Sequence, residues 1–129
     1  LERLSDATAI ALDSDQPEAM IIPDTYHMFL AGTGPNALGR LHGDFIAIFQ
    51  FADAGKEVEP ILHKGVDSQR VLPGDGKIDL KGYLTSLKKT GFDGCVSLEL
   101  YNPEYRKREP VAFLEEALRK TVKVVASVG

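Results

Sequence analysis

Helical periodicity occurs in both halves of the chain. In the first half, residues 1–14 predict a helix that stops at the turn residues before Pro17, and Pro35 can open a short helix that reaches His42. The apolar stripe of the first helix consists of Leu1, Leu4, Thr8, Ala11 and Leu12.

Two clearer helices lie in the second half. Asp79 can cap a helix whose apolar residues follow the i, i+3, i+4, i+7 spacing, and Gly91 stands where a left-handed C-terminal stop is expected. Residues 110–126 predict the last helix. Its expected core stripe consists of Val111, Leu114, Leu118, Val122 and Val125.

Three short apolar runs lie between these helices, at 18–24, 45–51 and 95–101, and predict buried strands. Strands that alternate with helices form parallel sheets through right-handed crossovers, with both faces covered. The sequence therefore predicts an α/β fold, and residues 1–129 contain no linker that would divide them into two domains. The stretch 52–77 has no clear period and is rich in Gly and Pro, so we expect a functional loop there.

Each predicted strand carries one polar side chain near its carboxyl end, namely Asp24, Gln50 and Glu99. Side chains alternate along a strand, so Phe49 and Phe51 should face the helices while Gln50 faces the other way. Parallel neighbours would bring these three side chains together at the sheet edge where parallel α/β folds bind ligands. Two carboxylates and an amide oxygen suit Mg or Mn, and Zn or Co when an imidazole joins them.

Each of these residues also has a structural explanation. Asp24 can be a turn residue, and Gln50 can be a hydrogen-bonded core amide. An ionised Glu99 inside an apolar strand is costly unless it is paired or bound to a metal. The matching positions of all three favour a functional site.

Residues outside the strands can complete such a site. His27 could donate a hydrogen bond to a substrate, and Arg70 could bind hydroxyl groups, a carboxylate or a phosphate through its guanidinium. The alternative for both is a solvent-exposed position in a surface loop. Asp53 is expected to cap a turn rather than to bind metal or orient Arg70, and Pro73-Gly74-Asp75-Gly76 to shape the loop. We expect Cys95 to be a packing residue. The imidazoles expected at the surface are His42 and His63.

Composition narrows the classes of partner. The net charge is -4, and the basic residues are scattered apart from Lys88-Lys89 and the run at 106–108, which argues against nucleic-acid binding. The apolar runs are far shorter than the ~20 residues of a membrane span, and no secretion leader is apparent. The single Cys95 cannot form an internal disulfide, so we expect a cytoplasmic protein.

An ordered set of motifs resembles the xylose isomerase-like TIM barrels, and more closely their sugar phosphate isomerase/epimerase group. The motifs are Asp24-Thr25-Tyr26-His27, Gln50-Phe51-Ala52-Asp53, Arg70-Val71-Leu72-Pro73-Gly74-Asp75-Gly76, Gly91-Phe92-Asp93-Gly94 and Ser97-Leu98-Glu99-Leu100-Tyr101-Asn102. The resemblance covers about residues 15–125. It implies a divalent ion (Mn, Mg, Co or Zn) held by a Glu, an Asp, a His and a second Glu.

The resemblance assigns a role to each matching residue. Asp24 matches the metal-binding Asp, and Glu99 matches the last Glu, which also serves as the proton-transfer base. His27 and Arg70 match residues that bind substrate. Gln50 replaces the usual His, as in dehydroshikimate dehydratase-like members, and the first Glu of the family has no match in this sequence.

A TIM barrel needs eight βα units and roughly 250 residues, whereas this sequence predicts three strands. We therefore expect residues 1–129 to form the C-terminal three βα units of a (β/α)8 barrel. The remaining half, or contacts in a homo-oligomer, would cover the open edges. On this interpretation the 129-residue chain alone is inactive.

The expected function is that of a divalent-metal-dependent isomerase or epimerase of a sugar or sugar phosphate, acting by proton transfer beside a metal-bound carbonyl or hydroxyl group. Gln50 favours one alternative, a metal-dependent dehydratase of a cyclic hydroxy acid. The alternative from another class is a non-catalytic fragment or binding module.

Overall fold

The computed structural model describes residues 3–61 and 66–129. The α-helices are α1 (Leu4–Asp13), α2 (Thr25–Leu30), α3 (Pro35–Leu38), α4 (Leu80–Lys89) and α5 (Pro110–Ala126). The strands are β1 (Phe49–Phe51), β2 (Asp53–Ala54), β3 (Arg70–Val71) and β4 (Val96–Leu98), and the short 3-10 helices are η1 (Gly43–Phe45), η2 (Asp67–Gln69) and η3 (Tyr105–Lys107).

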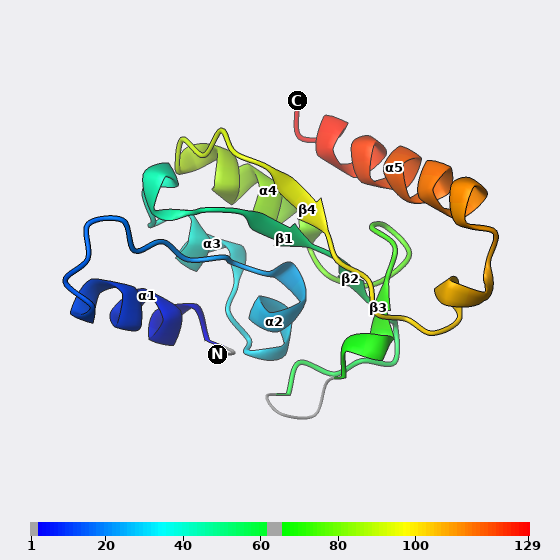
Figure 1. The fold of residues 1–129 in the computed structure, drawn as a ribbon, viewed down its shortest axis with the longest axis horizontal. Coiled ribbons are helices and arrows are strands. Elements are labelled where there is room, and N and C mark those ends of the chain that lie inside the picture. Colours follow the sequence, from blue (N-terminus) through cyan, green and yellow to red (C-terminus); the bar gives the residue numbers. More distant parts are fainter. Residues whose placement is uncertain (1–2, 62–65) are drawn as a thin grey trace.

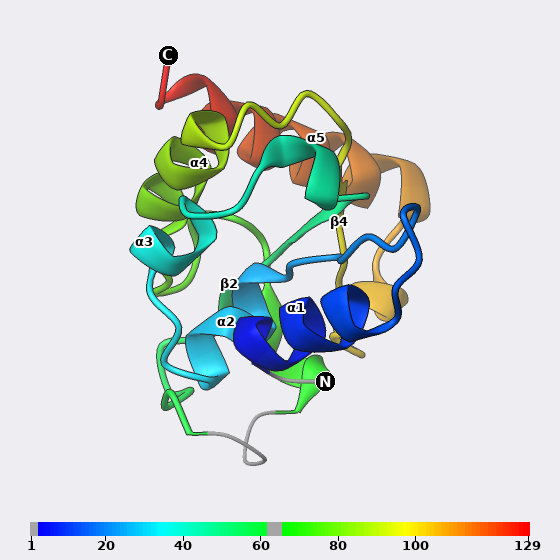
Figure 2. The ribbon, with the colours of Figure 1, turned by 90° about the vertical axis from the view of Figure 1, so that its left-hand side faces the viewer.

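Three parallel segments form the sheet that organises the molecule. β1 pairs with β4 in parallel, with Gln50 opposite Ser97. On the other side of β1, single parallel bridges join Ile21 to Ile46 and Asp24 to Gln50. Figure 1 shows β1 and β4 side by side, and Figures 1 and 2 place α1 and α2 below the strands and α4 and α5 above them. The predicted parallel α/β class is confirmed.

The strands are shorter than predicted. The first run, 18–24, forms two isolated bridges instead of a regular strand, because Pro23 has no N–H to donate to a ladder. The second predicted strand loses its first residues to η1 and the bend that follows, and β4 spans three residues of the run 95–101.

The core lies between this sheet and the helices that follow it. Phe49 and Phe51 are fully buried, as their predicted orientation required. α4 buries the predicted i, i+3, i+4, i+7 face, its N-cap Asp79 accepts a hydrogen bond from the Gly82 N–H at 2.9 Å, and Gly91 ends it with φ of 79°.

α5 forms at the predicted residues, but its predicted core stripe is wrong for this chain. The five stripe residues are 39% to 65% exposed, and the buried residue of the helix is Ala117. Figure 1 shows α5 on the α4 side of the molecule, and no layer of described residues covers its stripe. In the predicted stripe of α1, Leu12 is exposed, Leu4 and Ala11 are buried, and Leu1 lies outside the described residues.

Several elements were not predicted. α2 follows directly on Asp24, and β2 pairs antiparallel with β3 inside the stretch expected to be a loop. The helix predicted from Pro35 to His42 ends at Leu38. Among the described residues, no helix is long and apolar enough to cross a membrane.

Candidate metal and substrate site

Asp24 ends the first segment of the sheet and begins α2. Its carboxylate Oδ1 accepts hydrogen bonds from the N–H groups of Tyr26 (2.7 Å) and His27 (3.3 Å), so the residue is the N-cap of α2. The side chain is only 4% exposed. The cap fixes Asp24 beside Gln50, its bridge partner on β1, so the turn role and the site role coexist in one residue.

Gln50 and Glu99 meet across the sheet. The pairing of β1 and β4 continues one residue further, because the Glu99 N–H donates to the Phe51 carbonyl at 3.2 Å. The Gln50 Nε2 donates to Glu99 Oε1 at 3.1 Å, and the Tyr101 hydroxyl donates to the same oxygen at 3.4 Å. In this orientation of the side-chain amide, the Oε1 of Gln50 accepts no hydrogen bond from the described residues.

Arg70 lies between the carboxylates. Its Nη1 donates to both oxygens of Asp24, at 3.2 and 2.9 Å, and its Nη2 is 3.6 Å from Glu99 Oε2. Its Nε donates to Asp67 Oδ1 at 3.0 Å. The Nε2 of His27 is 3.2 Å from Nη2, so three of the expected site residues converge on this guanidinium.

The surroundings keep Arg70 charged. The side chain is 1% exposed, and burial alone would lower the pKa of Arg70, but the charge of Asp24 and the hydrogen bonds to Asp24 and Asp67 together raise it above its ordinary value. The guanidinium also lies 4.7 Å above the ring of Tyr26. Burial raises the pKa of Tyr26, against the opposing effect of Arg70, and its hydroxyl donates to the Val66 carbonyl at 2.9 Å.

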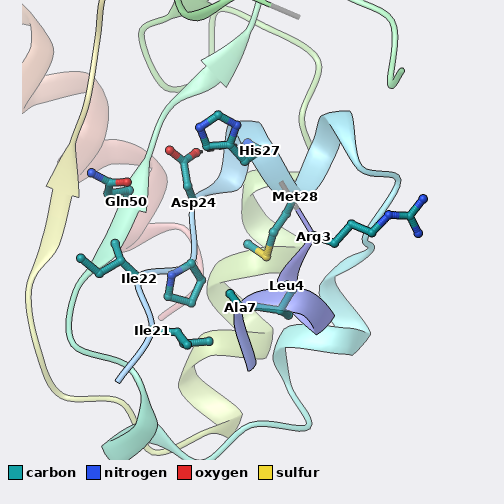
Figure 3. Close-up of a pocket in the computed structure, with 10 residues that line it drawn as sticks. Arg3, Leu4, Ala7, Ile21, Ile22, Asp24, His27, Met28 and Gln50 are labelled. Carbon is teal, nitrogen blue, oxygen red and sulfur yellow. Dashed lines mark hydrogen bonds between the residues drawn. The ribbon is translucent and has the colours of Figure 1, made fainter. Parts of the chain in front are cut away.

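A cavity of about 190 Å³ opens beside these residues, between α1, α2 and the first sheet segment. In Figure 3, Asp24, His27 and Gln50 lie at one end of it, and apolar side chains from α1 and α2 lie at the other. The lining thus combines polar side chains, including Arg3, with an apolar wall, which is the composition of a small-molecule site.

The side chains present can hold part of a divalent-metal site. Asp24, Gln50 and Glu99 offer two carboxylates and an amide oxygen from three adjacent parallel segments, and hard cations prefer such oxygen donors. No group of three His, Cys, Asp or Glu side chains within residues 3–61 and 66–129 could hold a metal ion. A fourth ligand would have to come from outside the described residues. This agrees with the sequence comparison above, in which the first metal-binding Glu of the family has no counterpart in this chain.

Other candidates lie away from this cluster. Asp53 is buried and caps the loop at 74–78, as expected, instead of contacting Arg70. Cys95, the residue just before β4, is exposed, which contradicts its expected packing role. His42 is at the surface, as expected, and His63 falls outside the described residues.

Sequence reasoning missed Asp67, Tyr26 and Tyr101 as neighbours of the site. The only available signal for Asp67 was its spacing of three residues from Arg70, which becomes a contact only because η2 forms a turn between them. The contact of Tyr26 with Arg70 depends on α2, which carries no apolar stripe long enough to detect.

Comparison with known proteins gives a consistent picture. The family described as xylose isomerase-like TIM barrel matches residues 1–121. An inosose isomerase of Bacillus subtilis is 36% identical over 106 residues, covering 82% of this chain and 37% of that protein. A 3-dehydroshikimate dehydratase of Pseudomonas putida is 34% identical over 97 residues, covering 72% of this chain and 14% of that protein.

Solved structures agree on the fold. A crystal structure of the IOLI protein with a bound zinc atom superposes with a TM-score of 0.88 at 29% identity, covering 98% of this chain and 44% of that one. A xylose isomerase domain protein from Alicyclobacillus acidocaldarius gives a TM-score of 0.84 at 23% identity. The chain thus spans less than half the length of these relatives and corresponds to part of a barrel. On the match over residues 1–121, the chain belongs to the xylose isomerase-like TIM barrel family.

Proposed function

We propose that these residues form part of the active site of a divalent-metal-dependent isomerase or epimerase that acts on a sugar or a similar polyhydroxylated carbonyl compound. The observation that carries the proposal is the convergence of Asp24, Gln50 and Glu99 at one end of the parallel sheet. The isomerase and zinc-binding relatives support the same chemistry.

In this proposal Asp24, Gln50 and Glu99 hold the ion, with a further ligand from outside the described residues. A bound divalent ion, whether Mn, Mg, Co or Zn, supplies a Lewis acid that polarises a carbonyl and its neighbouring hydroxyl group. The side-chain carbonyl oxygen of Gln50 accepts no hydrogen bond among the described residues, and Glu99 Oε2 accepts none from Gln50 or Tyr101 and has Arg70 Nη2 at 3.6 Å, so these two oxygens could bind the ion.

Glu99 moves the proton. Its Oε1 accepts hydrogen bonds from Gln50 and Tyr101, and its Oε2 lies 3.6 Å from Arg70 Nη2, so the half-buried carboxylate is held at both oxygens. A carboxylate fixed in this way can take a proton from the carbon next to the carbonyl and return it to a neighbouring position. His27 and the Nη2 of Arg70 lie 3.2 Å apart and together can orient the substrate oxygen on which negative charge develops.

The test uses Glu99→Gln in the full-length protein loaded with Mn²⁺. We expect turnover of inosose or of a related sugar to fall by about 10²- to 10⁴-fold, the usual contribution of a general base, while the fold is retained. Exchange of the substrate carbon-bound hydrogen with D₂O, followed by NMR, should be lost in parallel.

The matched control is Glu104→Gln, which removes an exposed carboxylate five residues further along the chain, whose ion-pair partner among the described residues is Lys107. It should leave turnover unchanged. The proposal is wrong if Glu99→Gln retains exchange and turnover, or if a sugar binds tightly to the wild-type protein without any divalent ion.

A metal-dependent dehydratase is the second candidate. It is favoured by the amide of Gln50 in place of the usual imidazole and by the similarity to 3-dehydroshikimate dehydratases. Incubation with 3-dehydroshikimate separates the two reactions. Loss of water with formation of a new double bond would appear as a change in ultraviolet absorbance, whereas isomerisation exchanges the carbon-bound hydrogen and retains the oxygen.

A further inference from the structure

Arg70 carries one positive charge that is shared by three carboxylates. Asp24 lies 2.9 Å from Nη1, Asp67 lies 3.0 Å from both Nε and Nη2, and Glu99 lies 3.6 Å from Nη2. Two of these acids are the proposed metal ligands, and the third, Asp67, has no role in the proposed reaction. Four formal charges within contact distance cannot be independent, because each carboxylate changes how strongly the guanidinium binds the others.

Asp67 is placed to hold Arg70 from the side away from the metal ligands. It belongs to η2, three residues before Arg70, and its side chain is 52% exposed, so it contacts solvent on one side and the buried guanidinium on the other. The ring of Tyr26 supports the guanidinium from below, and the Tyr26 hydroxyl binds the Val66 carbonyl next to Asp67. The loop and the ring together fix the position of Arg70.

We propose that Asp67 is a positioning residue of the metal site that acts through Arg70. By binding Nε and Nη2, it draws the guanidinium and part of its charge away from Asp24 and Glu99, and so raises the affinity of these two carboxylates for a divalent cation. This inference rests on the proposed function, because it assumes that Asp24 and Glu99 bind the ion.

The physical reason lies in the burial of Arg70. In Asp67→Asn, Nε and Nη2 keep at most a neutral acceptor, so the guanidinium, which is 1% exposed, loses one of its three charged partners. The guanidinium would then pair more strongly with Asp24 and Glu99, the acceptors that remain within reach. A divalent cation approaching the same oxygens must compete with that fuller positive charge.

The experiment measures Mn²⁺ binding to the metal-free full-length protein by isothermal titration calorimetry, with no substrate present. Asp67→Asn should weaken Mn²⁺ binding by about tenfold, at the lower end of the effect known for groups that orient metal ligands. Asp67→Glu, which restores the carboxylate, should recover most of the affinity. Asp75→Asn is the matched control, since Asp75 is also a part-exposed loop acid with a cationic partner, Lys120, and it should change nothing.

A second background tests whether Asp67 acts through Arg70. In Arg70→Met protein, adding Asp67→Asn should change Mn²⁺ affinity by less than about twofold, because the group that transmits the effect is gone. Thermal unfolding of each metal-free variant shows that the protein is folded. An unchanged affinity in Asp67→Asn, or an equal loss in both backgrounds, overturns the inference and leaves the proposed function standing. A wild-type protein that binds no divalent ion overturns both.

Discussion

At the scale of single residues, one carboxylate organises the loop that follows β3, the strand that contains Arg70. Asp53 follows β1, and its Oδ1 accepts hydrogen bonds from the N–H groups of Ala54 and Ile78, both at 2.9 Å. Its Oδ2 accepts from those of Gly74 and Gly76, both at 3.0 Å. Gly76 is required here, since a Cβ at that position would collide with the Asp53 carboxylate.

This arrangement predicts a large cost for a small change. Each Asp53 oxygen accepts from two backbone N–H groups, so Asp53→Asn, which replaces one oxygen by an NH₂ group, leaves two of these four donors without an acceptor. We expect the free energy of unfolding to fall by about 2–4 kcal/mol. Hydrogen bonds to a buried charged acceptor are strong, and an N–H group that loses its acceptor inside the protein is no longer compensated for its loss of hydration. Urea denaturation of the full-length variant measures this.

Asp75→Asn is again the control, because it changes the same group in the same loop at a part-exposed ion pair with Lys120. That pair should contribute at most about 1 kcal/mol. Equal destabilisation by the two substitutions would show that the buried network of Asp53 does not hold the loop.

At the scale of elements, α4 is joined to the segment before α3 by one buried phenol. Tyr83 donates a hydrogen bond from its hydroxyl to the Thr33 carbonyl, and burial raises the pKa of Tyr83 to about 12. A neutral phenol is therefore favoured by the folded state. The stabilisation is complete below the ordinary tyrosine pKa of about 10 and is lost as the pH rises toward the folded-state value.

Tyr83→Phe tests this linkage. Between pH 8 and pH 11 the wild-type protein should lose about 1 kcal/mol of stability that the variant does not lose, because the unfolded phenol ionises in this range and the folded one does not. Urea denaturation at both pH values in the two proteins gives the difference, in which the titration of all other groups cancels. A difference that does not change with pH would mean that Tyr83 ionises equally in both states.

The elements also differ in how far the sequence predicts them. α4 was predicted to within a residue because its cap, apolar face and glycine stop are all encoded locally. The convergence of Asp24, Gln50 and Glu99 followed from parallel pairing, since equivalent strand ends meet at one edge. α2 and the β2–β3 pair could not be predicted, because they are short and depend on partners far along the chain, such as the N–H groups of Gly74, Gly76 and Ile78 that bind Asp53.

At the scale of the whole molecule, the apolar surfaces that remain exposed are consistent with part of a barrel. The stripe of α5 and residues such as Ile22 and Ile48 on the open face of the sheet are all at least 38% exposed. Side chains of this kind normally lie in a core. The chain superposes on 44% of the zinc-containing relative, which leaves more than half of that structure to cover equivalent surfaces.

The stripe of α5 offers a direct test of this interpretation. Leu118 is exposed in the 129-residue chain, so Leu118→Ala should change the stability of that chain by no more than about 0.5 kcal/mol, the usual range for a surface substitution. In a full-length protein whose remaining barrel packs on α5, the same change should cost about 2–5 kcal/mol, because it then creates a cavity in a core.

Leu84→Ala is the matched control, since Leu84 is buried within the described residues on α4. It should destabilise both proteins by a similar amount, which shows that each unfolds from a packed core. Leu118→Ala must therefore differ from Leu84→Ala in the short chain and resemble it in the full-length protein. If Leu118→Ala is neutral in both, the stripe of α5 is not a barrel interface, and the exposed leucines must be explained by the surface chemistry of this chain alone.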